Sequence, residues 1–152
     1  METRKLKVFI QNEADSFVKH IHNEKTFVLK GTVRISRAYP FPYGFILDTT
    51  AADGLNVDCF VLTRKRLRTG QVVDCDAIGL MEQIEDGTED HNVLAVIPGE
   101  DQQLNGEWMQ TLTDFVNHVF DHVEGKLIHA GYFRGREAAL EHVARREDFS
   151  AV

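Results

Sequence analysis

The chain has 152 residues, of which 17 are Lys or Arg and 24 are Asp or Glu, so its formal net charge is −7 at pH 7. This length is typical of one domain, and we expect a single domain over residues 1–152. The acidic balance argues against nucleic-acid binding, which needs a basic surface to neutralise phosphates. No apolar run is long enough to span a membrane and no signal-peptide core is present, so we expect no membrane partner and a cytoplasmic protein.

Most of the sequence between residues 5 and 97 has the pattern of short β-strands. Residues 5–10 are a candidate first strand, and residues 26–35 are rich in β-branched and aromatic side chains, with Gly31 marking a bulge or bend. Turn residues, such as Asp86-Gly87, separate the later strands, and this spacing indicates a small barrel. The later strands are predicted at residues 44–48, 57–62, 72–78 and 93–97.

One helix is predicted within this β-rich part, at residues 12–21. Asn12 is a suitable N-cap residue and Asp15 follows three residues later, which is typical of a helix start. His20 and His22 fall at the end of this helix. Because residues two apart do not share a helix face, we expect two surface histidines there and no metal-binding pair.

The C-terminal part is predicted to be mainly helical. Residues 106–120 place their apolar side chains on roughly one face, and Gly125 is expected to end that helix as its C′ residue. Residues 126–132 predict a strand, and residues 137–146 predict a final helix with basic residues in its last turn. The sum is an α+β fold, mainly β, with a barrel and flanking C-terminal helices.

Two acidic clusters are the strongest chemical signal. Asp53 and Asp58 flank one strand start, and Glu85 and Asp90 repeat the same spacing around an Asp-Gly turn. Carboxylates gathered on one face of a barrel suit Mg²⁺, which prefers oxygen ligands and keeps several waters. Each cluster taken alone is better explained as a solvated surface turn than as a site, because Asp-Gly is common turn chemistry.

Three other groups of residues have simpler explanations than a site. The basic run Arg64–Arg68 is expected to be a solvated turn between strands. Cys59 and Cys75 are expected to be reduced core thiols. His118 and His122 have a spacing that occurs in zinc sites, but no third ligand is evident, and histidines suit the C-terminus of a helix.

Three motifs stand in a fixed order over residues 27–98. They are Tyr39-Pro40-Phe41-Pro42-Tyr43-Gly44-Phe45-Ile46, then Asp53-Gly54-Leu55-Asn56-Val57-Asp58, then Ile78-Gly79 followed by Glu85 and Asp90. Their order resembles that of the soluble, family I inorganic pyrophosphatases. That resemblance implies an OB-like five-stranded β-barrel with flanking helices, Mg²⁺ as cofactor, pyrophosphate as substrate and a homo-oligomer, either trimer or hexamer.

The same resemblance implies roles for individual residues. Tyr43 falls at the family's substrate-side tyrosine, and with Asp58 it is a candidate catalytic residue. Lys30 and Arg34 are candidate substrate-binding residues, because they flank Gly31, which stands where the family has an arginine. The implied metal ligands are Asp53, Asp58, Glu85 and Asp90.

The sequence departs from the family's pattern at two positions that bear on catalysis. Leu55 occupies the place of the aspartate that orients or deprotonates the attacking water, and leucine can do neither. Asn92 occupies the place of a phosphate-binding lysine, so a cation is absent there. The expected activity is therefore a weak or altered inorganic diphosphatase.

Three functions follow from these observations. The first is Mg²⁺-dependent hydrolysis of pyrophosphate or a related phosphoanhydride. The second is a catalytically silent protein of the same fold that acts as a binding or assembly module, which Leu55 and Asn92 favour. The third is an OB-like barrel that binds single-stranded nucleic acid by aromatic stacking, which the acidic charge disfavours.

Overall fold

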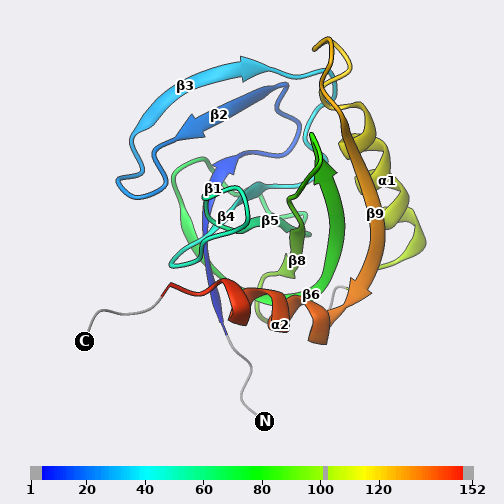
Figure 1. Ribbon diagram of the computed structural model, residues 1–152. Helices are drawn as coiled ribbons and strands as arrows, with labels where there is room; N and C mark the ends of the chain where they lie inside the picture. Colours follow the sequence, from blue (N-terminus) through cyan, green and yellow to red (C-terminus); the bar gives the residue numbers. More distant parts are fainter. Residues whose placement is uncertain (1–4, 101–102, 149–152) are drawn as a thin grey trace.

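A closed five-stranded barrel is the centre of the computed structural model, which describes residues 5–100 and 103–148. Its strands are connected by hydrogen bonds in the order β1, β4, β5, β8 and β6, and β6 pairs again with β1 to close the ring (Figure 1). The β5–β8 pair is parallel and the others are antiparallel. The predicted OB-like barrel is therefore confirmed. The strands are β1 (Leu6–Asn12), β4 (Tyr43–Ile46), β5 (Asp58–Val61), β6 (Val72–Glu85) and β8 (Asn92–Val96).

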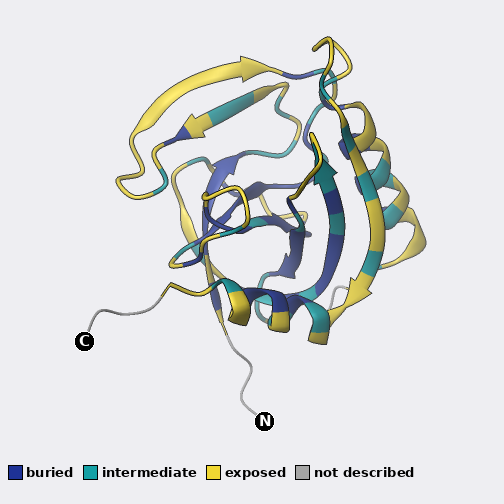
Figure 2. Ribbon diagram, viewed as in Figure 1, coloured by how far each residue is buried: buried dark blue, intermediate teal, exposed yellow. Residues whose placement is uncertain are grey.

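Further strands extend the barrel at one end. β6 continues beyond the ring, where it pairs with β9 (Ile128–Gly135) and with the short β7 (Thr88–Glu89). β2 (Val18–His22) and β3 (Leu29–Arg34) form a separate hairpin that arches over this end of the barrel (Figure 1). All six residues of β3 are exposed, in contrast to the buried barrel strands (Figure 2).

Two helices cover the barrel and divide the core into two parts. α2 (Arg136–Arg146) lies across the lower end in Figure 1 and adds Ala139 and Val143 to the apolar cluster inside the barrel. α1 (Gly106–His118) packs on the outer side, where Trp108 and Phe115 join an aromatic cluster. Asn105 caps α1 by accepting a hydrogen bond from the backbone N–H of Trp108, at 2.9 Å.

The predicted helix at residues 12–21 is wrong. Asn12 is the last residue of β1, and its side-chain oxygen accepts a hydrogen bond from the backbone N–H of His20 (2.7 Å) instead of capping a helix. Asp15 has a φ of 68°, which places it in a turn. Val18–His22 then pairs with β3, so tertiary pairing overrides the local helix signal. His22 is buried against the ring of Phe9 and is not a surface histidine.

The predicted end of the long helix at Gly125 is also wrong. α1 ends at His118, and Gly125, with a φ of 79°, lies in the turn that leads to β9. His118 and His122 consequently do not share a helix face. His118 pairs with Asp121 (Nδ1 to Oδ2, 2.9 Å), whereas the ring of His122 bonds the hydroxyl of Ser36.

Gly44 is expected to be the barrel glycine least tolerant of substitution. A Cβ at Gly44 would lie 1.8 Å from the backbone oxygen of Phe9, because β4 and β1 approach closely there. Gly44→Ala should destabilise the protein by about 3 kcal/mol or more, measured by urea unfolding. Gly31→Ala is the matched control, since nothing lies within 4 Å of its Cβ position, and an equal loss in both variants would contradict this account.

Candidate active site

Two carboxylates, the partly buried Asp58 and the buried Asp90, lie together at one end of the barrel. Asp58 begins β5 and is in register with Asn92 on the parallel strand β8, while Asp90 stands just before β8. The Asp90 backbone N–H donates a hydrogen bond to the carbonyl oxygen of Gln83 at 2.9 Å, which holds the connection between β7 and β8 against β6. The parallel pairing of β5 and β8 thus brings together two carboxylates that are far apart in the sequence.

The environment of this pair disfavours two negative charges. Burial, and then the charge of Asp90, hold the pKa of Asp58 well above its usual range. Burial, followed by the charges of Asp53 and Glu85, raises the pKa of Asp90 to about 6, although its hydrogen bond with Asp58 acts in the opposite direction. The Oδ1 atom of Asp90 is buried and has no hydrogen-bond partner among the described residues. A cation bound between the carboxylates would relieve both effects.

Tyr43 lies directly beside this pair. It begins β4, is fully buried, and stacks on Tyr39 with ring centroids 5.3 Å apart. Its hydroxyl hydrogen-bonds Asp58, and burial followed by the Asp58 charge raises the Tyr43 pKa well above its usual value. Tyr43 therefore keeps its proton and serves as a fixed hydrogen-bond donor.

Glu85 and Asp53 stand at the rim of the site. Glu85 ends β6 at a tight turn in which Asp86 and Gly87 both have positive φ, 49° and 83°. Its carboxylate pairs with Lys126, Nζ to Oε1, at 3.0 Å. Asp53 is exposed in the β4–β5 loop, and its Oδ1 accepts the backbone N–H of Leu55 at 3.0 Å. Of the four predicted metal ligands, Asp58 and Asp90 are central and these two are peripheral.

Sequence reasoning missed two residues of the site, Lys19 and Glu24. Lys19, on β2, lines the same cavity as Asp90 and Glu85, and its charge lowers the pKa of Asp58. Glu24 lies close enough to Asp53 and Asp90 for their charges to raise its pKa, after burial, which is the larger cause. The wrong helix at residues 12–21 hid Lys19, because alternation along Val18–His22 is the signal that turns Lys19 toward the barrel.

The ring of Phe120 holds two ammonium groups near the carboxylates. Lys19 Nζ lies 5.6 Å and Lys126 Nζ 5.3 Å from its centroid, a cation–π arrangement. Burial lowers the Lys126 pKa, but hydrogen bonds to Glu85 and Asp86 outweigh it, and the pKa is raised overall. The site therefore combines buried carboxylates with two cations, as binding of a metal–anion pair requires.

Lys30 and Arg34 are not brought to this cavity. Both have exposed side chains on β3, and neither lines the cavity beside Asp90. In the β2–β3 register Lys19 is opposite Val33, so Arg34 belongs to the other face of the hairpin. Lys30 lies at an irregularity between Gly31 and Leu29. Their role in substrate binding stays a prediction.

The two positions that depart from the family's pattern differ in their surroundings. The Leu55 side chain is 54% exposed, so a leucine there adds nothing to the core. Asn92 is buried, its amide nitrogen donates to Gln83 Oε1 at 2.6 Å, and its Oδ1 has no partner among the described residues. Asn92 is therefore a polar but uncharged side chain in the wall of the cavity next to Asp90.

The carboxylates of the site fit a Mg²⁺ ion that is held by few protein ligands and completed by waters and substrate. Among residues 5–100 and 103–148 no three His, Cys, Asp or Glu side chains stand together as a ready-made metal group. Mg²⁺ usually binds through one or two carboxylates together with waters and substrate phosphates, and Asp58 with the unpartnered Asp90 Oδ1 suits that mode. The cavity has about 30 Å³, room for a water or two, so a phosphate ligand would lie at its mouth.

This barrel, with carboxylates and ammonium groups gathered at one end, has the fold of the soluble pyrophosphatase class. The chain belongs to the inorganic pyrophosphatase family, whose model matches residues 4–146. It is 28% identical over 149 residues to the inorganic pyrophosphatase of Thermoplasma volcanium, which covers 90% of this chain and 88% of that relative.

Two solved structures are similar over most of the chain. The crystal structure of the inorganic phosphatase from Anaplasma phagocytophilum has a TM-score of 0.84 at 26% identity and covers 93% of this chain and 91% of that one. The inorganic pyrophosphatase from Coxiella burnetii has a TM-score of 0.86 at 24% identity, with 96% and 95% covered, which shows the shared fold. No helix in the described part of the chain is long and apolar enough to cross a membrane.

Proposed function

We propose that the protein is a Mg²⁺-dependent hydrolase of pyrophosphate or a related phosphoanhydride, with a weak or altered activity. The observation that carries this proposal is the Asp58–Asp90 pair, in which both pKa values are raised and the buried Oδ1 of Asp90 has no hydrogen-bond partner among residues 5–100 and 103–148. Family membership supports the same reaction class.

Each residue of the site has a separate task in this proposal. Asp58 and Asp90 hold Mg²⁺ from inside the barrel, with Glu85 and Asp53 at the rim. Mg²⁺, when bound, neutralises phosphate charge and acidifies a bound water. Lys19 and Lys126, held against Phe120, attract the anionic substrate. Tyr43 donates a hydrogen bond and keeps Asp58 oriented.

The second candidate is a catalytically silent binding or assembly module. Leu55 provides no group that accepts a proton from water, and Asn92 provides a neutral amide committed to Gln83. A site of this kind holds a metal or an anion without turning it over.

Phosphate release from pyrophosphate is the experiment that separates the two functions. We expect turnover that requires Mg²⁺ and disappears with EDTA, and Asp90→Asn should lower it by about a hundredfold or more. Asp74→Asn is the matched control, because Asp74 pairs with Lys7 on the barrel surface at 2.9 Å. A wild-type protein inactive with Mg²⁺, Mn²⁺ and Zn²⁺ alike would contradict the hydrolase proposal.

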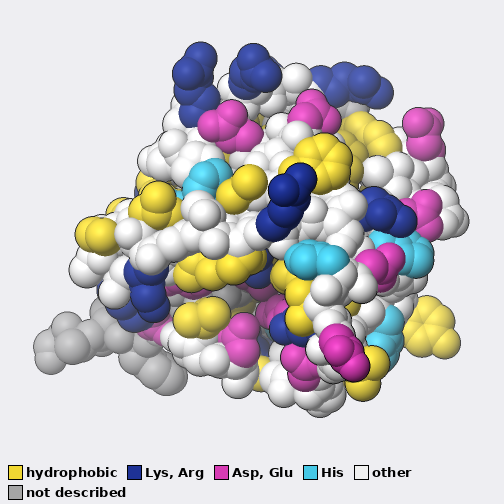
Figure 3. All heavy atoms as spheres, turned by 90° about the horizontal axis from the view of Figure 1, so that it is seen from above, with side chains coloured by type: hydrophobic (Ala, Val, Ile, Leu, Met, Phe, Trp, Pro, Cys, Tyr) yellow, Lys and Arg dark blue, Asp and Glu magenta, His cyan; other side chains and the backbone are white. Residues whose placement is uncertain are grey.

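Assembly into a homo-oligomer, a trimer or hexamer, is part of the proposal. Exposed hydrophobic side chains gather around the β2–β3 hairpin, and the face seen in Figure 3 shows hydrophobic side chains among charged ones. Such a patch supports a protein contact. A cytoplasmic location is proposed as well, in keeping with two buried cysteines that are not paired. The hydrophobic side chains are Phe17, Val18, Ile21, Phe27, Val28, Leu29 and Val33.

A further inference from the structure

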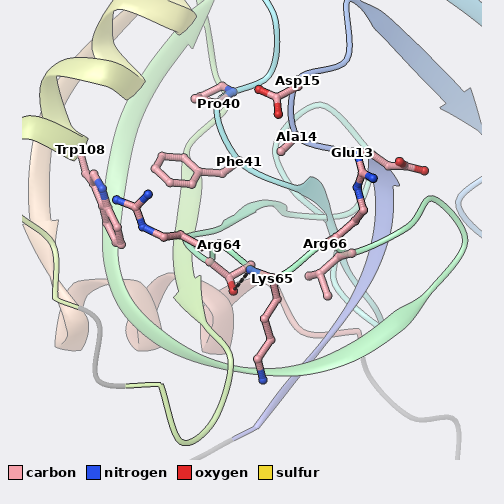
Figure 4. A pocket seen from close by; sticks show the side chains of 11 residues that line it. Glu13, Ala14, Asp15, Pro40, Phe41, Arg64, Lys65, Arg66 and Trp108 are labelled. Atoms are coloured by element: carbon pink, nitrogen blue, oxygen red, sulfur yellow. Dashed lines mark hydrogen bonds between the residues drawn. The ribbon is translucent and has the colours of Figure 1, made fainter.

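A second cavity, larger than the one beside Asp90, lies elsewhere on the barrel. It has a volume of about 320 Å³ and lies between the β5–β6 loop, the segment before β4 and the start of α1 (Figure 4). Ligand sites begin at about 300 Å³. Among the described residues, none that lines this cavity also lines the one beside Asp90, so the two are separate.

One wall of this cavity carries three cations without partners. The side chains of Arg64, Lys65 and Arg66 are exposed and form no hydrogen bond or ion pair with any residue that the structure describes. The net charge of the protein is −7, so this cluster of positive side chains is opposite in sign to the protein as a whole. Figure 4 shows Arg64 extending toward Trp108 and Arg66 toward Glu13, on opposite sides of the cavity, whereas the Lys65 side chain points away from both. Guanidinium groups suit phosphate because they bind its oxygens in pairs.

The loop that carries these cations is fixed at both ends. The Thr63 hydroxyl accepts the backbone N–H of Lys65 at 3.0 Å and donates to Glu100 at 2.7 Å. Leu67 is buried and anchors the loop in the barrel core. The Thr69 backbone N–H donates to Glu13 at 3.2 Å. The cations are therefore presented on a preformed loop, which lowers the ordering cost of binding.

The floor of the cavity is apolar and aromatic. Phe41 and Trp108 meet edge to face with ring centroids 5.3 Å apart, and both are held in the core cluster. Pro40 and Ala14 complete this surface. Phe41 is 7% and Trp108 is 9% exposed, so the two rings present only an edge to the cavity, and a flat apolar group gains free energy by covering that edge.

Two carboxylates complete the wall opposite Arg64. Glu13 and Asp15 line the cavity from the β1–β2 turn (Figure 4). Carboxylates accept hydrogen bonds from hydroxyl or amino groups and repel a bare anion. The ligand that satisfies the cations, the aromatic floor and these acceptors together has a phosphate, a planar ring and hydroxyl donors.

We propose that this cavity binds a nucleoside phosphate, with its phosphate groups toward Arg64 and Arg66, the base against the exposed edges of Phe41 and Trp108, and the ribose hydroxyls toward Glu13 and Asp15. Phe41 lies between Tyr39 and Tyr43 in the sequence, so the cavity borders the segment that carries the active-site tyrosine. The binding itself does not depend on hydrolysis of pyrophosphate.

The test uses Trp108, which is the only tryptophan of the chain, as a reporter. The full-length protein is titrated with ADP at fixed ionic strength and with EDTA present, and its fluorescence is followed. Equilibrium dialysis with labelled ADP measures binding independently of the fluorescence. We expect saturable binding that the Arg64→Gln/Arg66→Gln variant weakens by about tenfold or more. Arg68→Gln is the matched control, since Arg68 is in the same loop but does not line the cavity.

Comparison of ligands tests the chemical assignment. Adenosine and inorganic phosphate are each expected to bind more weakly than ADP. Adenosine lacks the phosphate that the cations bind, and inorganic phosphate lacks the base and the ribose. The proposal is overturned if dialysis shows no saturable ADP binding, if Arg68→Gln weakens binding as much as the double variant, or if phosphate binds as tightly as ADP. Circular dichroism confirms that the variants are folded, so a loss of binding is not a loss of structure.

Discussion

Asp58→Asn is expected to stabilise the metal-free protein while it abolishes pyrophosphate hydrolysis. Asp58 is buried beside Asp90 and its pKa is well raised, so at neutral pH its carboxyl group carries a free-energy penalty that an amide does not. The gain should appear as a higher Tm of the metal-free variant, and each kcal/mol corresponds to a few degrees at this chain length. Turnover should fall by about a hundredfold or more, because a metal ligand is lost.

The pH dependence of this gain follows from the raised pKa values. A carboxyl group whose folded pKa lies above its unfolded value of 3.8 destabilises the protein as pH rises from that value to the folded pKa. For Asp90 the folded value is about 6, and for Asp58 the rise is in the same direction. The advantage of Asp58→Asn should therefore be small near the unfolded pKa and grow toward neutral pH, measured as the difference in Tm from wild type.

Magnesium provides the control for this experiment. Mg²⁺ should raise the Tm of wild type, because a cation that binds only the folded state stabilises it, and should have little effect on Asp58→Asn. Asp74→Asn should behave as wild type in every respect, since Asp74 is an exposed partner of Lys7. A lower Tm for metal-free Asp58→Asn, or a full Mg²⁺ response, would contradict the account of the carboxylate pair.

Leu55→Asp combined with Asn92→Lys is expected to raise turnover by about a hundredfold or more, the range typical of a restored proton-transfer group. Leu55 is 54% exposed, so an aspartate there costs little stability. Asn92 is buried beside Asp90, and a lysine at this position would place an ammonium group where the carboxylates offset its burial. The measurement is phosphate release with saturating Mg²⁺.

A matched variant isolates the proton-accepting group. Leu55→Asn/Asn92→Lys has the same shape and the same added cation but no carboxylate at residue 55. If both double variants have equal turnover, a carboxylate at residue 55 does not act as the proton acceptor, and the Leu55 substitution does not explain the low activity. Activity that appears only with Leu55→Asp identifies the natural protein as the silent module, whereas measurable wild-type turnover that rises further identifies a slow enzyme.

Local patterns in the sequence were sufficient for the barrel strands. Alternating β-branched and aromatic residues between turn residues predicted the positions of β4, β5 and β8 closely, because each is short and bounded by turns. β6 was predicted to be shorter, since its continuation to Glu85 depends on pairing with β9. Periodicity also gave α1 and α2, while the end of α1 depended on tertiary contacts.

The sequence by itself determined the barrel, the family resemblance and the identity of the acidic residues, because these depend on local alternation and on motifs within single segments. Only the tertiary structure decided which carboxylates meet. Asp58 and Asp90 come together through the parallel β5–β8 pair, and Lys19 reaches them because residues 18–22 pair with β3 and do not form a helix. Strand register and burial are long-range properties, so local residue preferences cannot specify them.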